Sequence, residues 1–238
     1  MSQPIFREGT INFTYDGEIY QTYYKLFGEL DGRTRDPIVV LHGGPGLVHD
    51  YLFPFANLAT QHNFPVILYD QIGNGRSSHI KEKDPAFWTI DLFIDELVNL
   101  ITHFSIQDGF DLVGHSWGGI LASEFEVRRQ PAGLKRLVLS NSLPAISLWT
   151  QSNMQLLEAF PEEVKKGIME GMKDPEGYFR ALKELHAVHG CLARPIPAEY
   201  WYTLDQVFGP AGDPTVASAP YVHFHCLSND MGVNPSSP

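Results

Sequence analysis

A chain of 238 residues, 43% hydrophobic and 19% charged, is long enough to bury one sizeable core. Its formal net charge of −11 argues against a nucleic-acid partner, and no apolar run approaches the roughly 20 residues that a membrane-spanning helix needs. The first ten residues lack the basic and apolar segments of a secretory signal, and the two cysteines lack a C-x-x-C spacing. We therefore expect a cytosolic protein with Cys191 and Cys226 as free thiols.

The chain opens with two alternating segments, residues 8–15 and 18–27, and the pair Asp16-Gly17 between them predicts a two-residue hairpin turn. After this hairpin, short apolar strands alternate with amphipathic helices. Strands are predicted at 37–41, 64–70, 110–114 and 135–140, and helices at 51–62, 88–104 and 120–129. Such an alternation predicts a mostly parallel sheet with helices on both faces.

The pattern changes after Ser142. Between residues 147 and 208 the chain shows successive helical segments interrupted by prolines, with no clear strand. This arrangement indicates a helical cap placed over the sheet. We therefore divide the chain into a core at residues 1–145, a helical cap at 146–210 and a tail at 211–238.

A G-x-S-x-G motif at residues 114–118 stands between a predicted strand and a predicted helix. Glycines on both sides of the serine let strand and helix close around a residue with a strained backbone. This is the pattern of a nucleophile elbow, so we expect Ser116 to be a catalytic nucleophile. A glycine-rich turn with an incidental serine is the alternative.

A serine nucleophile also needs hydrogen-bond donors for the oxyanion of its tetrahedral intermediate. One donor in such a site is the backbone N–H that follows the nucleophile, here that of Trp117, and the other comes from the loop after the third strand. That loop is HGGPG at residues 42–46, whose glycines let the backbone approach a substrate carbonyl closely. We expect the second donor to be the N–H of Gly44, with a plain Gly-Pro loop as the alternative.

Three motifs, HGGPG at 42–46, YDQIGNGRSS at 69–78 and GHSWGG at 114–119, resemble the proline iminopeptidases and their relatives in the S33 family of serine peptidases. The resemblance runs from about residue 5 to residue 220. It implies an α/β-hydrolase fold and release of an N-terminal residue, often proline, from small peptides or amino-acid amides by a Ser-Asp-His triad, without a metal or other cofactor. Ile72 stands where the family usually has arginine, which leaves room for a broader aminopeptidase or amidase specificity.

Two histidines and one aspartate lie within these motifs, yet none is expected in the triad. His115 precedes the nucleophile on the elbow, where its side chain should point away from the pocket. His42 is expected to orient the HGGPG loop by hydrogen bonding, and Asp70 to bond the backbone of the loop at 73–75.

The predicted cap contains one further candidate. Relatives hold the free α-amino group of the substrate on carboxylates of the cap, and the resemblance implies Glu184 for this role. A solvated helix charge is the alternative. His186 and His189 lie three residues apart on the same predicted helix, but no third ligand is in view, so we expect no metal site.

The triad acid and base have no expected place in this sequence. In this fold the acid follows a late strand and the histidine comes nearer the C-terminus. Residues 221–227 can be read as a strand with Asp230 past its end, but His223 and His225 precede that acid. We therefore expect a domain without its last strands and helices, with an unpaired edge at 135–140 and little activity.

Two other functions stay open beside the aminopeptidase. A non-catalytic product of the same gene would follow from the missing triad residues. A general esterase is disfavoured by the HGGPG loop and by the free amine that the family requires. For all three we expect no nucleic-acid or membrane partner, and the sequence does not determine an oligomeric state.

Overall fold

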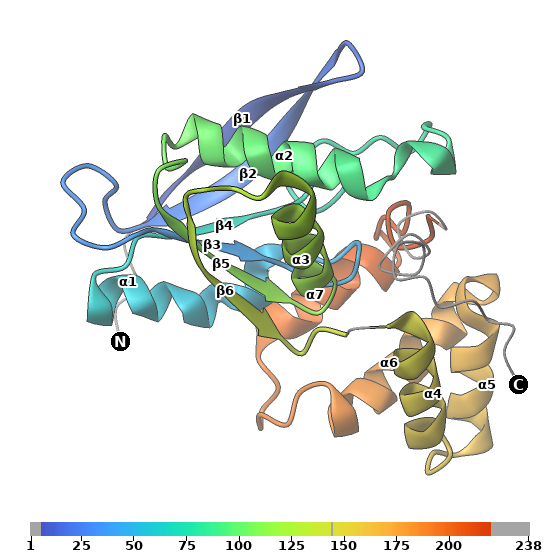
Figure 1. Cartoon of the computed structure of the whole chain (residues 1–238). Coiled ribbons are helices and arrows are strands. Elements are labelled where there is room, and N and C mark those ends of the chain that lie inside the picture. Colours follow the sequence, from blue (N-terminus) through green and yellow to red (C-terminus); the bar gives the residue numbers. More distant parts are fainter. Residues whose placement is uncertain (1–5, 144, 220–238) are drawn as a thin grey trace, which may run out of the picture.

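The computed structural model describes residues 6–143 and 145–219 (Figure 1). Its centre is a six-stranded sheet in the order β1-β2-β4-β3-β5-β6. The strands are β1 (Phe6–Tyr15), β2 (Glu18–Phe27), β3 (Ile38–Leu41), β4 (Val66–Tyr69), β5 (Phe110–His115) and β6 (Leu134–Ser140). The last four run parallel to one another, whereas β2 pairs antiparallel with both β1 and β4. The predicted α/β fold with its mostly parallel sheet is confirmed.

The β1–β2 hairpin turns at the predicted residues. Asp16 and Gly17 have φ values of 53° and 78°, and Tyr15 pairs directly with Glu18 across the turn. Two positive φ angles are what a tight hairpin of this type needs, because they match the right-handed twist of the two strands. The sequence therefore specified both the turn and the register of this pair.

The helices follow the predicted order. They are η1 (His49–Ala56), α1 (Asn57–His62), η2 (Pro85–Phe87), α2 (Ile90–His103), α3 (Trp117–Arg129), α4 (Ile146–Leu157), α5 (Glu162–Glu170), η3 (Gly171–Lys173), α6 (Pro175–His189) and α7 (Ala198–Phe208). One prediction needs correction, because the stretch at 51–62 is two helices rather than one. Its first part, η1, is a 3-10 helix that contains Pro54, a residue without a backbone N–H to donate.

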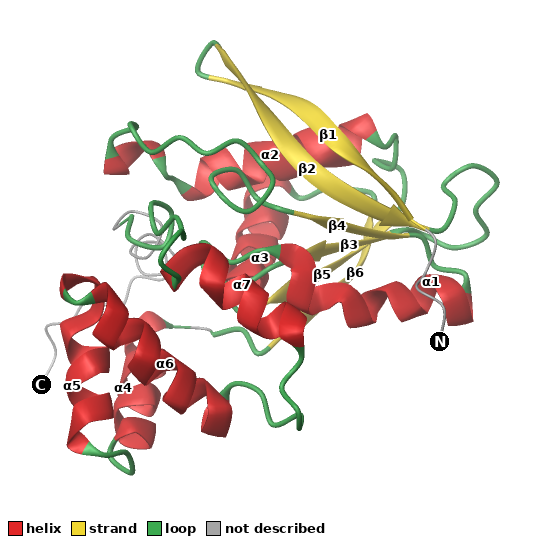
Figure 2. Cartoon of the chain, turned by 180° about the vertical axis from the view of Figure 1, so that it is seen from behind, coloured by secondary structure: helices red, strands yellow, loops and turns green. Residues whose placement is uncertain are grey.

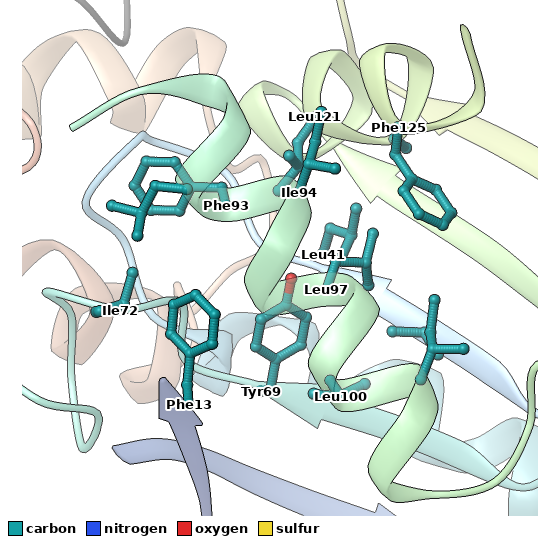
Figure 3. Packing of buried hydrophobic residues seen from close by; sticks show 14 of the residues in the cluster. Phe13, Leu41, Tyr69, Ile72, Phe93, Ile94, Leu97, Leu100, Leu121 and Phe125 are labelled. Atoms are coloured by element: carbon teal, nitrogen blue, oxygen red, sulfur yellow. The ribbon is translucent and has the colours of Figure 1, made fainter. Parts of the chain in front are cut away.

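The core lies on both faces of the sheet, because successive residues of a strand point to opposite sides. Val39 and Leu41 of β3 pack under α2 and α3, whereas Ile38 and Val40 pack against η1 and α1. Figure 3 shows the first of these clusters from close by. The side chains labelled there are Phe13, Leu41, Tyr69, Ile72, Phe93, Ile94, Leu97, Leu100, Leu121 and Phe125. All four residues of β3 and of β4 are buried, as expected for strands covered on both faces.

Helices α4 to α7 occupy the stretch in which the sequence predicts a cap. In Figure 2, α4, α5 and α6 form a group beside the sheet, and α7 lies between this group and the sheet. Helix α7 contacts η1 of the core as well as α6. The helical content of this stretch is as expected, and the division into core, cap and tail remains a proposal.

The segment after α7 packs on the core, although the sequence assigned residues 211–219 to the tail. Val216 is fully buried, and its side chain lies so close to Gly73 that a Cβ there would be 2.4 Å away. Ala217 lies against Gly46 of the HGGPG loop in the same way. Residues 220–238, which include the predicted strand, Asp230, the two late histidines and Cys226, lie outside the described residues.

Strand β6 forms one edge of the sheet and, among the described residues, pairs only with β5. Val138 and Leu139, whose side chains point to opposite faces, are 49% and 51% exposed. Neither face of β6 is therefore sealed. The unpaired edge predicted at 135–140 is confirmed for the described part of the chain.

Two further expectations concern the whole described chain. None of its helices combines the length and the apolar character that crossing a membrane requires. Cys191 is a free thiol, as predicted.

Candidate active site

Ser116 sits at the turn between β5 and α3 with φ 54° and ψ −119°. An L residue rarely adopts this conformation, and it persists only where its surroundings enforce it. Here the N–H of Ser116 donates to the C=O of Ser140 at 2.9 Å, and Ser142 Oγ donates to the C=O of Ser116 at 3.0 Å. The predicted arrangement of strand, sharp turn and helix around Ser116 is confirmed.

Two glycines of the motif permit this turn because neighbouring backbone leaves no room for a side chain. A Cβ on Gly114 would lie 2.2 Å from the C=O oxygen of Gly118, and a Cβ on Gly118 would lie 2.3 Å from that of Leu41. Helix α3 therefore begins in contact with the ends of β5 and β3. The glycines are required by close packing, which is why the motif has them on both sides of the serine.

The HGGPG loop lies directly beside the nucleophile. A Cβ on Gly43 would be 3.1 Å from Ser116 Cβ, so the expected proximity of this loop and Ser116 is confirmed. The N–H of Gly43 is already used, since it donates to the Tyr51 hydroxyl at 2.8 Å. The N–H groups of Gly44 and Trp117 have no acceptor among the described residues, and Trp117 is the first residue of α3. Neither N–H is therefore engaged within the described part of the chain, and their role as oxyanion donors stays a prediction.

His42 holds the loop in place, as predicted. Its Nε2 accepts a hydrogen bond from the N–H of Gln71 at 2.9 Å, so Nδ1 carries the proton and faces the C=O of Gly43 at 3.0 Å. Burial lowers the pKa of His42 to about 4. The ring is therefore neutral at pH 7 and serves as a fixed connector in a fully buried position.

Gln71 connects the loop to the elbow, a role that the sequence analysis missed. Its Nε2 donates to the C=O of His42 at 3.1 Å, and its Oε1 accepts from Trp117 Nε1 at 3.0 Å. Both donor and acceptor ends of the amide are satisfied in a buried position. The available signal was the place of Gln71 directly after a strand that ends beside the HGGPG loop.

Asp70 has the structural role predicted for it, but with different partners. Its Oδ2 accepts from the N–H of Arg76 at 3.0 Å, just past the loop at 73–75. Its Oδ1 accepts from the N–H of His49 at 2.9 Å and lies 2.6 Å from His49 Nδ1. Burial alone would raise the pKa of Asp70, but the adjoining His49 brings that pKa down to about 2. The carboxylate stays ionised and ties η1 to the segment after β4.

His115 is not placed as a base for the nucleophile, in agreement with the prediction. Its Nδ1 lies 2.7 Å from the Tyr51 hydroxyl, and burial lowers the pKa of the ring. Ser116 Oγ makes no hydrogen bond to any described residue. Residues 6–143 and 145–219 therefore contain the predicted nucleophile and the predicted oxyanion donors, but no base that is hydrogen-bonded to the hydroxyl.

Glu184 lies exposed on α6 and forms no hydrogen bond or ion pair with the described residues. Its role as a substrate-binding carboxylate stays a prediction. On the same helix His186 Nδ1 is 2.8 Å from the Tyr200 hydroxyl, and the His189 ring packs on Phe160. The two histidines belong to no cluster of metal-ligating groups in the described part of the chain.

The one cluster of such groups among the described residues is His49, Asp50 and Asp70. Arg76 already occupies this cluster. Its guanidinium donates to both oxygens of Asp50, at 2.9 and 3.1 Å. A cation is thus supplied by the chain itself, and the cluster is an ion-paired support beneath η1.

Ile72 replaces the arginine that the family usually carries. Its side chain is fully buried in the core on the α2 side of the sheet (Figure 3). The replacement changes the packing of the core. It therefore gives no direct information about which substrate residue the site prefers.

Comparison with known proteins identifies the class. Residues 36–168 match the family model described as the alpha/beta hydrolase fold, and the chain belongs to this family. Curated proline iminopeptidases of Clostridium botulinum and Lactiplantibacillus plantarum are 36% identical over 154 residues and 38% identical over 138 residues. These matches cover 65% and 58% of this chain, but 51% and 47% of the relatives. The chain thus spans about half the length of the curated relatives it matches.

Solved structures extend the likeness over nearly the whole chain. The protein in the crystal structure of VinJ is 36% identical in sequence to this chain, and the two superpose with a TM-score of 0.79. The match covers 94% of this chain and 74% of VinJ. The proline iminopeptidase of Mycobacterium smegmatis is 29% identical with a TM-score of 0.72, covering 93% and 74%. The resemblance to proline iminopeptidases inferred from the three motifs is confirmed.

Proposed function

We propose that this chain is a serine aminopeptidase of the proline iminopeptidase type, which releases an N-terminal residue, proline or a similar one, from small peptides or amino-acid amides. The observation that carries the proposal is the strained Ser116, placed beside a loop with an unused backbone donor. In this reaction Ser116 Oγ attacks the carbonyl carbon after the N-terminal residue. The N–H groups of Gly44 and Trp117 hold the oxyanion that forms.

A complete reaction also needs a base to take the serine proton and an acid to orient that base. Because no described residue contacts Ser116 Oγ, we place both groups outside residues 6–143 and 145–219. From the order of acid and histidine in this fold, we also propose that residues 1–238 alone react slowly. Loss of a triad member typically lowers kcat by several orders of magnitude, and the oxyanion donors leave a small residual rate.

Glu184 completes the proposal as the carboxylate for the substrate ammonium group. An exposed carboxylate without a cation among the described residues supports this role, because it is free to take one from the substrate. The proposal also includes a cytosolic location and a reaction without metal, nucleic-acid or membrane partners.

The first test compares three proteins on the p-nitroanilide of proline. They are residues 1–238, the same chain extended by the C-terminal part of the Mycobacterium smegmatis enzyme that lies beyond the aligned region, and this extended chain with Ser116→Ala. We expect turnover by the extended chain, a rate at least about a thousandfold lower for residues 1–238, and loss of turnover with Ser116→Ala. Equal rates for the two versions with Ser116 would instead locate the base within residues 1–238, with His223 and His225 as candidates.

The second test concerns Glu184 and uses the extended chain. Glu184→Gln should lower kcat/KM for substrates with a free amine by about tenfold or more, while N-acetylated analogues should hardly change. Glu176→Gln is the matched control, since Glu176 is an exposed acid on the same helix that pairs with Arg180 at 3.7 Å. Equal losses on both kinds of substrate would show that Glu184 is structural.

A non-catalytic protein is the second candidate. Two observations on the described residues favour it. The Ser116 hydroxyl has no hydrogen-bond partner among them, whereas a reactive site needs a base, and they leave the edge at β6 open, whereas a stable sheet needs its edges covered. The first test separates the two functions. Absence of turnover from a folded extended chain would favour the non-catalytic protein.

A further inference from the structure

One hydroxyl group contacts both the nucleophile's turn and the oxyanion loop. The N–H of Gly43 donates to Tyr51 Oη at 2.8 Å, and Tyr51 Oη lies 2.7 Å from His115 Nδ1. An amide N–H can only donate, so the hydroxyl oxygen accepts there, and its own proton can be donated to His115 Nδ1 when that nitrogen carries no proton. Tyr51 therefore joins the residue before Ser116 to the residue before Gly44.

The state of His115 fits this assignment. Burial lowers the pKa of the ring, so it is neutral at pH 7. Because Nδ1 accepts the Tyr51 proton, the single ring proton lies on Nε2. The two rings meet edge to face with centroids 5.2 Å apart, a favourable aromatic contact.

The groups involved meet at one point in space. A Cβ built on Gly43 would be 3.1 Å from Ser116 Cβ, 3.1 Å from Tyr51 Oη and 3.2 Å from His115 Nδ1. These approaches are tighter than ordinary side-chain contacts, so a displacement of Tyr51 would alter the spacing between loop and nucleophile. That spacing decides how well an oxyanion donor reaches the reacting carbonyl.

The start of η1, which carries Tyr51, is fixed by contacts that do not involve the elbow. The two residues before Tyr51 on η1 are buried and held by hydrogen bonds: His49 bonds Asp70, and Asp50 receives two hydrogen bonds from Arg76. Such contacts restrict the start of η1 and with it the direction of the Tyr51 ring. None of these four residues forms a hydrogen bond with Ser116 in the described structure.

We propose that Tyr51 is a positioning residue that sets the distance between Ser116 and the oxyanion loop. By occupying the Gly43 N–H, its hydroxyl also leaves the next N–H, that of Gly44, as the donor that faces the substrate. The proposal rests on the proposed serine hydrolase function for its catalytic meaning. The hydrogen bonds themselves can be tested without turnover.

The test uses residues 1–238 with Tyr51→Phe, followed by NMR. In the unmodified chain we expect His115 as the Nε2–H tautomer, assigned from ring ¹⁵N shifts that disappear in His115→Gln. In Tyr51→Phe the tautomer preference should weaken, and hydrogen exchange of the Gly43 amide should accelerate about tenfold. Tyr200→Phe is the matched control, since it removes a tyrosine–histidine hydrogen bond in the cap and should leave both signals unchanged.

Three outcomes would overturn the proposal. The first is an Nδ1–H tautomer of His115 in the unmodified chain, which needs no variant and so is readable even if Tyr51→Phe fails to fold. The second is unchanged Gly43 exchange in a folded Tyr51→Phe. The third is unchanged kcat in the extended chain that turns over proline p-nitroanilide, where we expect Tyr51→Phe to lower kcat about tenfold with KM altered less than about twofold.

The proposed function can fail separately. If neither version of the chain turns over a substrate, the serine hydrolase assignment falls. The exchange rate and the tautomer then still decide whether Tyr51 fixes the loop.

Discussion

Strands β3 and β6 flank the same strand, β5, but one is sealed and the other is open. All four residues of β3 are buried, whereas none of the seven residues of β6 is. Helices cover β3 on both faces, while Val138 and Leu139 leave both faces of β6 half exposed. The nucleophile between these strands thus has a rigid neighbour on one side and an open edge on the other.

The elbow at Ser116 makes most of its side-chain contacts on the β3 side. On the β3 side the elbow touches Leu41 through Gly118, and it is bonded to the HGGPG loop through Gln71 and Tyr51. On the β6 side it has backbone contacts to the end of the strand and to Ser142. These contacts can keep Ser116 and the HGGPG loop in place although one edge of the described sheet is open.

The largest effect should come from filling the contact between the elbow and β3. Gly118→Ala would ordinarily stabilise a helix by about 1 kcal/mol. Here the new Cβ would lie 2.3 Å from the C=O oxygen of Leu41, so we expect destabilisation by about 3 kcal/mol or more. Urea unfolding measures it, and Ser123→Ala on the same helix is the control, expected to cost less than about 1 kcal/mol. A stabilising Gly118→Ala would show that the elbow and β3 are not in close contact.

Truncating a leucine to alanine should lower the free energy of unfolding by more in the sealed part of the sheet than at the open edge. Leu112→Ala in β5 removes a fully buried side chain on the sealed face and should lower the free energy of unfolding by about 3 kcal/mol. Leu139→Ala removes a side chain that is 51% exposed and should lower it by less than about 1 kcal/mol. Chemical denaturation of both variants measures the two losses in unfolding free energy. Similar losses would mean that β6 is covered in solution.

A buried acid on the sealed side should also make the free energy of unfolding depend on pH. Glu96 on α2 is fully buried, receives hydrogen bonds from Thr22 and the N–H of Ile72, and has its pKa raised to about 8 by burial. Because the folded pKa exceeds the unfolded value of about 4.5, Glu96 stabilises the fold fully below pH 4.5 and loses that contribution as the pH rises through 8. Between pH 5 and pH 8 we expect a loss on the order of 3 kcal/mol.

Glu96→Gln is the variant that isolates this effect, because an amide imitates the protonated carboxyl without titrating. The difference in unfolding free energy between the two proteins should change across pH 5 to 8. A difference that is independent of pH would contradict a neutral Glu96. The acid on the open side, Asp111, differs in having a cation, Arg136, at 2.8 Å.

The smallest effect on stability should come from charging the open edge. Val138→Lys together with Leu139→Lys should change the free energy of unfolding by no more than about 0.5 kcal/mol, since both side chains already reach water. The variant should nevertheless associate less at high concentration, because lysines on an edge strand oppose pairing with another chain. Light scattering measures this. Ile19→Lys, at a site 66% exposed on the hairpin, is the control, and an equal reduction there would show that the edge is not responsible.

Local patterns in the sequence predicted much of the fold. The Asp16-Gly17 turn, the apolar runs of β3 and β4, and the G-x-S-x-G elbow each follow from a few adjacent residues, because steric limits on φ and the period of side chains act locally. Helix boundaries were less accurate. The stretch with Pro54 is two helices, η1 and α1, rather than one. Helix α2 begins at Ile90 rather than at residue 88, because Thr89 caps it by accepting a hydrogen bond from the N–H of Leu92.

The sequence by itself thus determined the α/β-hydrolase fold, the sharp turn at Ser116 and the loop beside it, because the motifs that predict them are contiguous residues with restricted backbone geometry. Only the tertiary structure decided the contacts between distant segments. It brought Tyr51 to Gly43 and His115, turned Asp70 toward Arg76 and His49, placed Ile72 in the core, and packed Val216 on Gly73. Such contacts depend on how helices and loops close over the sheet, so no pattern of neighbouring residues encodes them.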